Sequence, residues 1–171
     1  AIGTRTFGGD PFWVSGMASA FTHGIKDGHS TNLTIVGKHF PGLGSADRFP
    51  EDEVSTVRRT LDQLEQVELE PFFALTGRSE TEGSKLDGLL ITHIRYQGLQ
   101  GNIRAETKPI NFDPQALDLL FSLPELSTWR ESGGLLFSDD LNSRTVQSAY
   151  DPTDTGFSIR RPALEAFLAG N

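Results

Sequence analysis

The sequence has no cysteine, a single methionine and only two residues each of tryptophan and tyrosine. Without cysteine there can be no disulfide, no catalytic thiolate and no zinc site built on sulfur ligands. No apolar run approaches the length of a membrane-spanning helix, so we expect no membrane span. Basic residues are also scarce, 15 against 23 acidic ones, and the net charge of -8 argues against nucleic acid as a partner.

The first residues, AIGTRTFGG, contain no initiator methionine, no basic segment and no apolar segment. They do not resemble a signal peptide or a natural start, so we expect a piece from the middle of a longer protein. With 36% hydrophobic residues, the 171 residues are enough for one globular domain or part of one. The sequence carries no signal for a compartment or for an oligomeric state.

Two helices are indicated by the same start signal. Asp10 before Pro11, and Asp113 before Pro114, place an N-cap carboxylate directly ahead of a proline at the first helical position. Apolar residues at helical spacing follow in both cases. The first of these helices should stop near Gly24.

A third helix is indicated by a capping box. Thr60 and Gln63 stand three residues apart ahead of an apolar stretch, and Pro71 should kink that helix or end it early. Two further helices are expected, one opening at Pro124 and one over residues 161–169.

Three short apolar runs predict buried strands, at residues 33–36, 89–91 and 135–137. Fully buried strands are typical of parallel sheets that helices cover on both faces. Strands and helices alternate along the chain, which points to parallel βα units. Residues 40–53 are dense in proline, glycine and charge, residues 95–112 lack a helical period, and both should be long loops.

Polar residues follow each predicted strand. Any one of these endings has an ordinary explanation, such as an Asx turn after the last strand or solvated side chains after the first. Three endings at one edge of a parallel sheet would instead build a polar pocket, as in barrel enzymes. The residues concerned are Lys38 and His39, Thr92 and His93, and Asp139 and Asp140.

Three motifs, in this order and at these spacings, resemble glycoside hydrolase family 3, most closely its bacterial β-N-acetylglucosaminidase branch: IGTRTFGGDP at 2–11, KHFPG at 38–42 and FSDDL at 137–141. The resemblance spans nearly the whole chain and implies an α/β fold with a (β/α)8-like barrel. A complete barrel needs about 250 residues. Residues 1–171 would then be the central part of a single barrel domain, a partial barrel of parallel strands and flanking helices without the early and final strands.

The resemblance also implies functional roles. Asp139 would be the nucleophile of a retaining glycoside hydrolase, and Arg5, Lys38 and His39 would hold the hydroxyl groups of the sugar. Cations beside a carboxylate keep it ionised, as a retaining mechanism requires. His93 is a further sugar-binding candidate because it ends the second predicted strand. The expected partner is a carbohydrate with a terminal β-linked sugar, of the β-N-acetylhexosaminidase or β-glucosidase type, and no cofactor is implied.

The 40–53 loop departs from the pattern of this branch. There the loop usually contains GDTxxDSH, whose Asp and His act together as acid and base, whereas GLGSADRFPEDE contains no histidine. Counting without gaps from Gly44 places Glu51 where that histidine would stand, so Glu51 is the candidate acid/base. Ser143 replaces a common methionine. These departures leave open the alternative that the protein is a relative that binds sugar without hydrolysing it. We expect no activity from this fragment alone.

The sequence does not match two other types of site, a receiver-like phosphate-accepting site and a histidine metal site. A receiver-like domain, which binds Mg²⁺ with paired acids, would need an acid cluster near the first strand and a lysine ending the last one, and neither is present. His23 and His29 have no partner at metal-ligand spacing, so no metal site is predicted.

Overall fold

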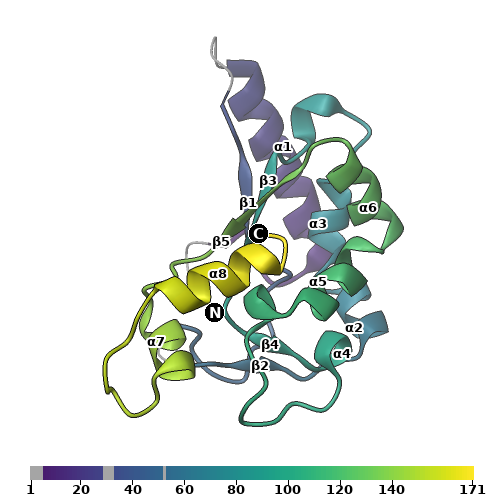
Figure 1. Ribbon diagram of the computed structural model, residues 1–171. Coiled ribbons are helices and arrows are strands. Elements are labelled where there is room, and N and C mark those ends of the chain that lie inside the picture. The colour runs from purple at the N-terminus through teal and green to yellow at the C-terminus, as the bar shows by residue number, and fades with distance from the viewer. Residues whose placement is uncertain (1–5, 29–32, 52) are drawn as a thin grey trace.

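The structure is a computed structural model that describes residues 6–28, 33–51 and 53–171. Arg5 and His29 therefore lie outside the described residues. Three strands, β1 (Val36–Phe40), β3 (Gly88–Ile91) and β5 (Leu135–Ser138), form a parallel sheet in the order β1-β3-β5. The parallel arrangement predicted from the sequence is confirmed. A separate parallel pair, β2 (Thr56–Val57) and β4 (Arg95–Tyr96), lies below this sheet in Figure 1.

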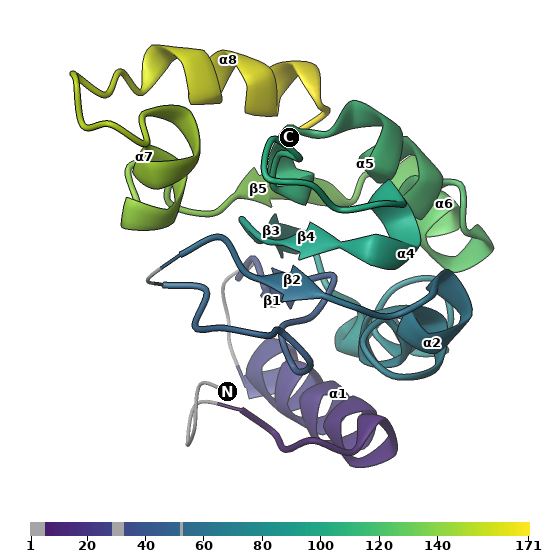
Figure 2. The same ribbon diagram turned by 90° about the horizontal axis from the view of Figure 1, so that it is seen from below.

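Helices cover one side of the sheet and flank the row of strands at both ends. Figure 2 shows α1 and α8 at opposite ends of the row of strands, with α2, α5 and α6 along one side. None of the helices in the described ranges is long and apolar enough to cross a membrane. The helices are α1 (Pro11–Gly28), α2 (Leu61–Gln66), α3 (Glu70–Ala74), α4 (Gln97–Gln100), α5 (Pro114–Phe121), α6 (Pro124–Glu131), α7 (Arg144–Tyr150) and α8 (Arg160–Leu168), with short 3-10 turns η2 (Glu82–Ser84) and η3 (Ile110–Phe112).

The predicted helix starts are confirmed at the level of single hydrogen bonds. The carboxylate of Asp10 accepts from the backbone nitrogens of Phe12 and Trp13, at 3.0 and 3.2 Å. Asp113 caps α5 by accepting from a backbone nitrogen in its first turn. The capping box of Thr60 and Gln63 is complete, with both reciprocal bonds present. Local side-chain chemistry therefore places these ends.

Two helix ends differ from the prediction. Helix α1 continues past Gly24 and ends at Gly28. The helix that begins after Thr60 ends at Gln66, before Pro71 is reached, and Pro71 instead lies in the first turn of α3. Proline fits a first turn because the backbone nitrogens there have no intrahelical acceptor.

The first strand also lies later than predicted. We expected residues 33–36, but β1 runs from Val36 to Phe40 because its partner β3 begins at Gly88, which pairs with Val36. The pairing becomes irregular between Gly37 and Phe40. Lys38 and His39 consequently lie within the strand rather than after it.

The prediction that the third strand is fully buried is wrong. Within β5, Leu135 is 49% exposed and Phe137 38% exposed. In the described part of the chain β5 pairs with β3 alone, so it is an edge strand with one uncovered face. An apolar run alone does not distinguish an edge strand from a central one.

Residues 95–112 are more regular than predicted, and one helix was missed. The segment contains β4, α4 and η3, and its first two residues pair with β2. Helix α7 begins at Arg144, in a segment for which we predicted no element, and its N-cap is the hydroxyl of Ser143.

The main core fills the space between the sheet and the helices on its side. Its largest fully buried side chains include Trp129, Tyr96 and Phe40. The ring of Phe40 packs edge-on against Phe72 at 5.0 Å and stacks on Phe121 at 5.9 Å. Truncating a buried aromatic side chain typically costs about 3–5 kcal/mol. This core fixes β1, and with it the two residues that precede Phe40.

Candidate active site

The carboxyl ends of the three parallel strands bring predicted site residues together. Nε2 of His39, in β1, lies 3.8 Å from Oδ2 of Asp139, the residue after β5. Their side chains are 18% and 33% exposed, so the pair is sheltered but open to a ligand. A protonated His39 would stabilise the ionised carboxylate of Asp139. We expected Lys38, His39, His93 and Asp139 at one edge; the structure brings His39, His93 and Asp139 together there, whereas Lys38 borders an adjoining cavity.

Asp139 is held at the end of β5 by its backbone. Its nitrogen donates to the carbonyl oxygen of Ile91 at 3.1 Å, continuing the ladder between β3 and β5. Its own Oδ1 accepts from the nitrogen of Asp140 at 2.8 Å, which leaves Oδ2 directed at His39. The carboxylate thus has one oxygen fixed by the turn and one facing the strand ends.

Asp140 fixes the loop. Its Oδ1 accepts from the backbone nitrogen of Asn142 at 2.9 Å, which is the Asx turn considered in the sequence. The two adjacent acids therefore have different surroundings: among the described residues, Asp139 contacts His39 of another strand, whereas the carboxylate of Asp140 bonds within its own turn.

His93 is buried beside these acids, with 5% of its surface exposed. Nε2 lies 3.1 Å from the carbonyl oxygen of Asp140, and the ring stacks on Phe112 with centroids 5.4 Å apart. A carbonyl oxygen only accepts, which assigns the proton to Nε2. Burial lowers the pKa of His93 below its ordinary value, although the nearby carboxylate of Asp139 acts in the opposite direction. The ring is therefore neutral near pH 7.

Lys38 and His39 also border a cavity of about 620 Å³ between β1 and α1. Apolar side chains such as Phe21 and Phe72 line much of it, and Thr6 and Glu68 add polar groups. This volume lies in the range of small-molecule sites. The cavity and the His39–Asp139 contact share one residue, His39.

Gly42, the last residue of KHFPG, stands at a position that has no room for a side chain. Its φ is 129°, and a Cβ there would lie 2.8 Å from Cβ of Glu68. Its carbonyl oxygen accepts from the hydroxyl of Tyr96 at 2.7 Å. Burial raises the pKa of Tyr96 well above its usual value, so the hydroxyl keeps its proton and donates. The close approach explains the motif's glycine.

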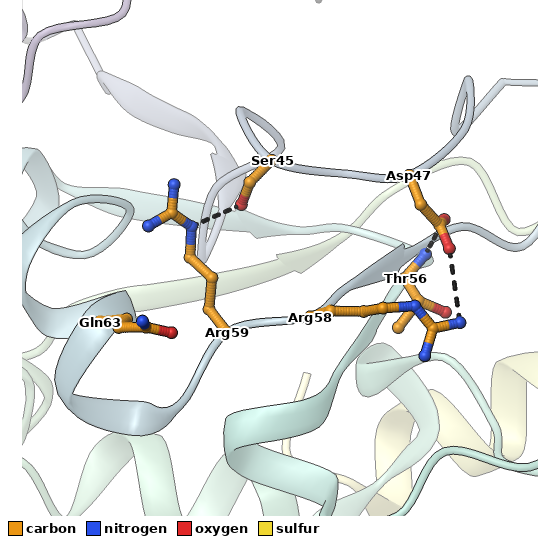
Figure 3. A pocket seen from close by; sticks show the side chains of 6 residues that line it. All are labelled: Ser45, Asp47, Thr56, Arg58, Arg59 and Gln63. Carbon is orange, nitrogen blue, oxygen red and sulfur yellow. Dashed lines mark hydrogen bonds and ion pairs between the residues drawn. The ribbon is translucent and has the colours of Figure 1, made fainter.

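The start of the 40–53 loop is anchored by an ion pair with a buried carboxylate, which the sequence analysis missed. Glu68, whose side chain is 2% exposed, accepts from Ser45 at 2.5 Å and lies 3.0 Å from Nε of Arg59. Figure 3 shows Arg59 reaching Ser45 across a second cavity, of about 440 Å³. On its other side Asp47 accepts from the backbone of Thr56 at 2.7 Å. No spacing in the sequence marked these partners.

Glu51 is exposed on the same loop. The loop is fastened beside it, because the hydroxyl of Thr145, in the first turn of α7, donates to the carbonyl oxygen of Pro50 at 2.6 Å. The loop carrying Glu51 therefore reaches the helix that follows Asp139 in the chain. Its position relative to the carboxylate of Asp139 stays a prediction.

The described residues form no candidate metal site. They contain no group of three or more His, Asp or Glu side chains placed to hold an ion. The described site is thus a carboxylate between two histidines, with a lysine at an adjoining cavity.

Parallel strands covered by helices, with a carboxylate and basic residues at their carboxyl ends, are the arrangement found in barrel-type domains. The chain belongs to glycosyl hydrolase family 3: the model of the family's N-terminal domain matches residues 1–166. A β-hexosaminidase from Idiomarina loihiensis is 29% identical over 99% of this chain and 45% of its own length. The chain thus spans less than half the length of that relative.

Solved structures agree on the fold. A family 3 β-N-acetylglucosaminidase from Paenibacillus superposes with a TM-score of 0.75 at 22% identity, covering 99% of this chain and 27% of that one. NagZ from Neisseria gonorrhoeae, in complex with N-trifluoroacetyl-D-glucosamine, superposes with a TM-score of 0.67 at 26% identity, covering 99% of this chain and 41% of that one. The mixed α/β architecture with parallel strands matches the barrel-like domain of these neighbours.

Proposed function

We propose that the protein is a retaining glycoside hydrolase that removes terminal β-linked sugars through a covalent glycosyl-enzyme, of the β-N-acetylhexosaminidase or β-glucosidase type. The observation that carries the proposal is the approach of His39 to Asp139 at the strand ends. Membership of family 3 and the β-hexosaminidase relatives support the same reading.

Asp139 is the nucleophile in this proposal. Its carboxylate oxygen attacks the anomeric carbon as the bond from that carbon to the leaving oxygen breaks, and a second carboxyl group gives its proton to the leaving group. Water then attacks the anomeric carbon of the glycosyl ester. The second carboxylate takes the water's proton, and Asp139 leaves as a free carboxylate.

Glu51 is the proposed second carboxyl group, because it occupies the loop position where related enzymes of the branch carry their acid/base. In a retaining enzyme the two carboxyl groups stand about 5–5.5 Å apart. The anchoring of the loop on Thr145 supports a closed position near Asp139. Lys38, His39 and Arg5 are the proposed ligands of the sugar hydroxyl groups, and the cavity beside Lys38 supports this for the first two.

We also propose that residues 1–171 are the central part of one barrel domain. Apolar side chains on α1 and α8 are open to solvent, and such patches usually mark surfaces that other structure covers. Further strand–helix units would bury them. We expect no activity from residues 1–171 alone. Adding the flanking sequence of the natural gene should raise the midpoint of thermal unfolding, and an unchanged midpoint would contradict this. The exposed residues include Phe12, Trp13, Met17, Phe21, Leu164, Phe167 and Leu168.

The test of the function is turnover of p-nitrophenyl N-acetyl-β-glucosaminide and p-nitrophenyl β-glucoside by the intact protein. Asp139→Asn should lower the rate by several orders of magnitude with the fold preserved, since the glycosyl ester cannot form. Near-normal turnover in that variant would reject the assignment. The alternative function is a sugar-binding protein that does not hydrolyse, favoured by the absence of a histidine in the 40–53 loop. Calorimetric binding without turnover would establish it.

A further inference from the structure

The 3-10 turn η3 contacts the ends of β3 and β5, two of the three strands that carry the candidate site. Its Asn111 donates from Nδ2 to the hydroxyl of Ser138, the last residue of β5, at 3.0 Å. Its Phe112 stacks on the ring of His93, which follows β3, with an interplanar angle of 6°. The backbone of η3 is tied to the same region, because the nitrogen of Ile110 donates to the carbonyl oxygen of Ile94 at 2.8 Å. One short turn thus supports two sides of the site.

Asn111 is fully buried, with no exposed surface. The hydroxyl of Ser138, which accepts from Asn111, donates in turn to the carbonyl oxygen of Asp139 at 2.8 Å. The carbonyl oxygen of Asn111 accepts from the side chain of Asn171 at 3.0 Å, which fastens the turn from behind. Two successive hydrogen bonds therefore connect a fixed amide to the main chain of Asp139.

The side chain of Asn111 lowers the stability of the fold at this position. Within the described part of the chain its Oδ1 is buried without a hydrogen-bond partner. An unsatisfied buried acceptor costs about 1–3 kcal/mol. A side chain of similar size without polar atoms would avoid that cost, so packing alone does not account for asparagine here.

His93 holds the other side of the same turn. Its Nε2–H donates to the carbonyl oxygen of Asp140, and its Nδ1 is buried with no hydrogen-bond partner among the described residues. Because the ring stacks on Phe112 and bonds to the carbonyl oxygen of Asp140, it is directed at the main chain after Asp140 and does not line the cavity beside Lys38.

We propose that Asn111 and His93 are positioning residues for Asp139, Asn111 acting through Ser138 and His93 through the main chain of Asp140. The proposal rests on the proposed role of Asp139 as nucleophile. In-line attack on the anomeric carbon requires the carboxylate to be placed closely, and a displacement of about 1 Å can cost roughly 100-fold in rate. The two residues fix the main chain on both sides of Asp139. For His93 this role replaces direct binding of the sugar.

The experiment compares matched variants of the intact protein with p-nitrophenyl N-acetyl-β-glucosaminide, after active sites have been counted from the burst of nitrophenolate. His93→Phe keeps the aromatic stack and removes the donor, whereas His93→Gln keeps an N–H donor and removes the ring. We expect His93→Phe to lower kcat about 10- to 100-fold with KM little changed, and His93→Gln to keep most of the rate. The opposite order would show that the ring serves packing only.

Asn111→Leu, which has a similar volume and no donor, should lower kcat in the same way. If that variant does not fold, Ser138→Ala breaks the same connection with a smaller change and should also lower kcat. A raised KM at unchanged kcat in these variants would overturn the proposal, since it would indicate substrate binding.

Asp139→Asn separates this proposal from the function on which it rests. If Asp139→Asn is inactive while His93→Phe and Ser138→Ala match the natural protein, the positioning role is wrong and the nucleophile stands. If Asp139→Asn is active, both fail.

Discussion

Oδ2 of Asp139 and Nε2 of His39 lie 3.8 Å apart although β3 separates their strands in the sheet. Side chains at the carboxyl ends of parallel strands can meet across an intervening strand because those ends lie at one edge of the sheet. The contact joins two of the three motifs by which the chain resembles its family, KHFPG and FSDDL.

Lys38→Ala should raise KM for a nitrophenyl glycoside and lower kcat/KM about 10- to 100-fold, since a hydrogen bond from a charged group is worth about 1.5–3 kcal/mol. The matched control is Arg58→Ala. Arg58 is an exposed cation outside the cavity that borders Lys38, with a 3.7 Å contact to Asp47. Its removal should change kcat/KM by less than about twofold. Equal effects of the two variants would contradict a sugar-binding role for Lys38.

Glu51→Gln should slow substrates with poor leaving groups far more than activated aryl glycosides, because only the former need a proton on the departing oxygen. Azide should restore the second step by replacing water as a nucleophile that needs no base. Glu53→Gln is the control, since Glu53 pairs with Arg48 on the surface at 2.6 Å. An equal and mild effect of Glu51→Gln on both substrate types would contradict the acid/base role and would indicate that the loop has a structural role only.

His93 should make the fold sensitive to mild acid. Burial lowers its pKa, so the folded protein keeps the ring neutral while the unfolded chain binds a proton near the ordinary value of 6.5. The contribution of His93 to stability is therefore complete above pH 6.5 and is lost as the pH falls through the lower folded-state pKa.

The measurement is the free energy of unfolding in urea at about pH 8 and about pH 5.5. The natural protein should lose more stability between these values than His93→Gln, in which the titrating group is absent. Asp139 and Asp140, which face His93, remain in both proteins. The same loss in both would show that His93 does not control the acid response.

Gly134→Ala should destabilise the fold by about 1–3 kcal/mol, because a Cβ there would lie only 2.3 Å from the ring of Trp129. That ring cannot move aside easily, as it is 1% exposed and donates to the carbonyl oxygen of Leu86 at 2.7 Å. Gly24→Ala, in α1 with no atom within 4 Å of the added carbon, should instead stabilise by about 0.5–1 kcal/mol. Urea unfolding of both variants tests the contrast, and a neutral Gly134→Ala would refute it.

The features that the sequence predicted well are those that depend on neighbours in the chain. Asp10, Asp113 and the Thr60–Gln63 pair cap their helices through residues two or three positions away. Helix α7 was not predicted, but it follows the same rule: the hydroxyl of Ser143 accepts from the backbone nitrogen of Val146, three positions away.

Features that depend on distant partners were predicted less well. The limits of β1 are set by its pairing with β3, and the exposure of β5 by the lack of a second strand beside it in the described chain. Asn111 lay in a segment expected to be a loop, and nothing in the spacing of INF marks it as a partner of Ser138.

By itself the sequence determined the alternation of strands and helices and the helix starts, since these depend on local spacing, backbone preference and capping. The tertiary structure alone decided that His39 meets Asp139, that His93 turns to the main chain of Asp140, and that Glu68 lies buried under Gly42 with Arg59. Such contacts depend on strand order and on the packing of side chains far apart in the chain, which no local pattern encodes.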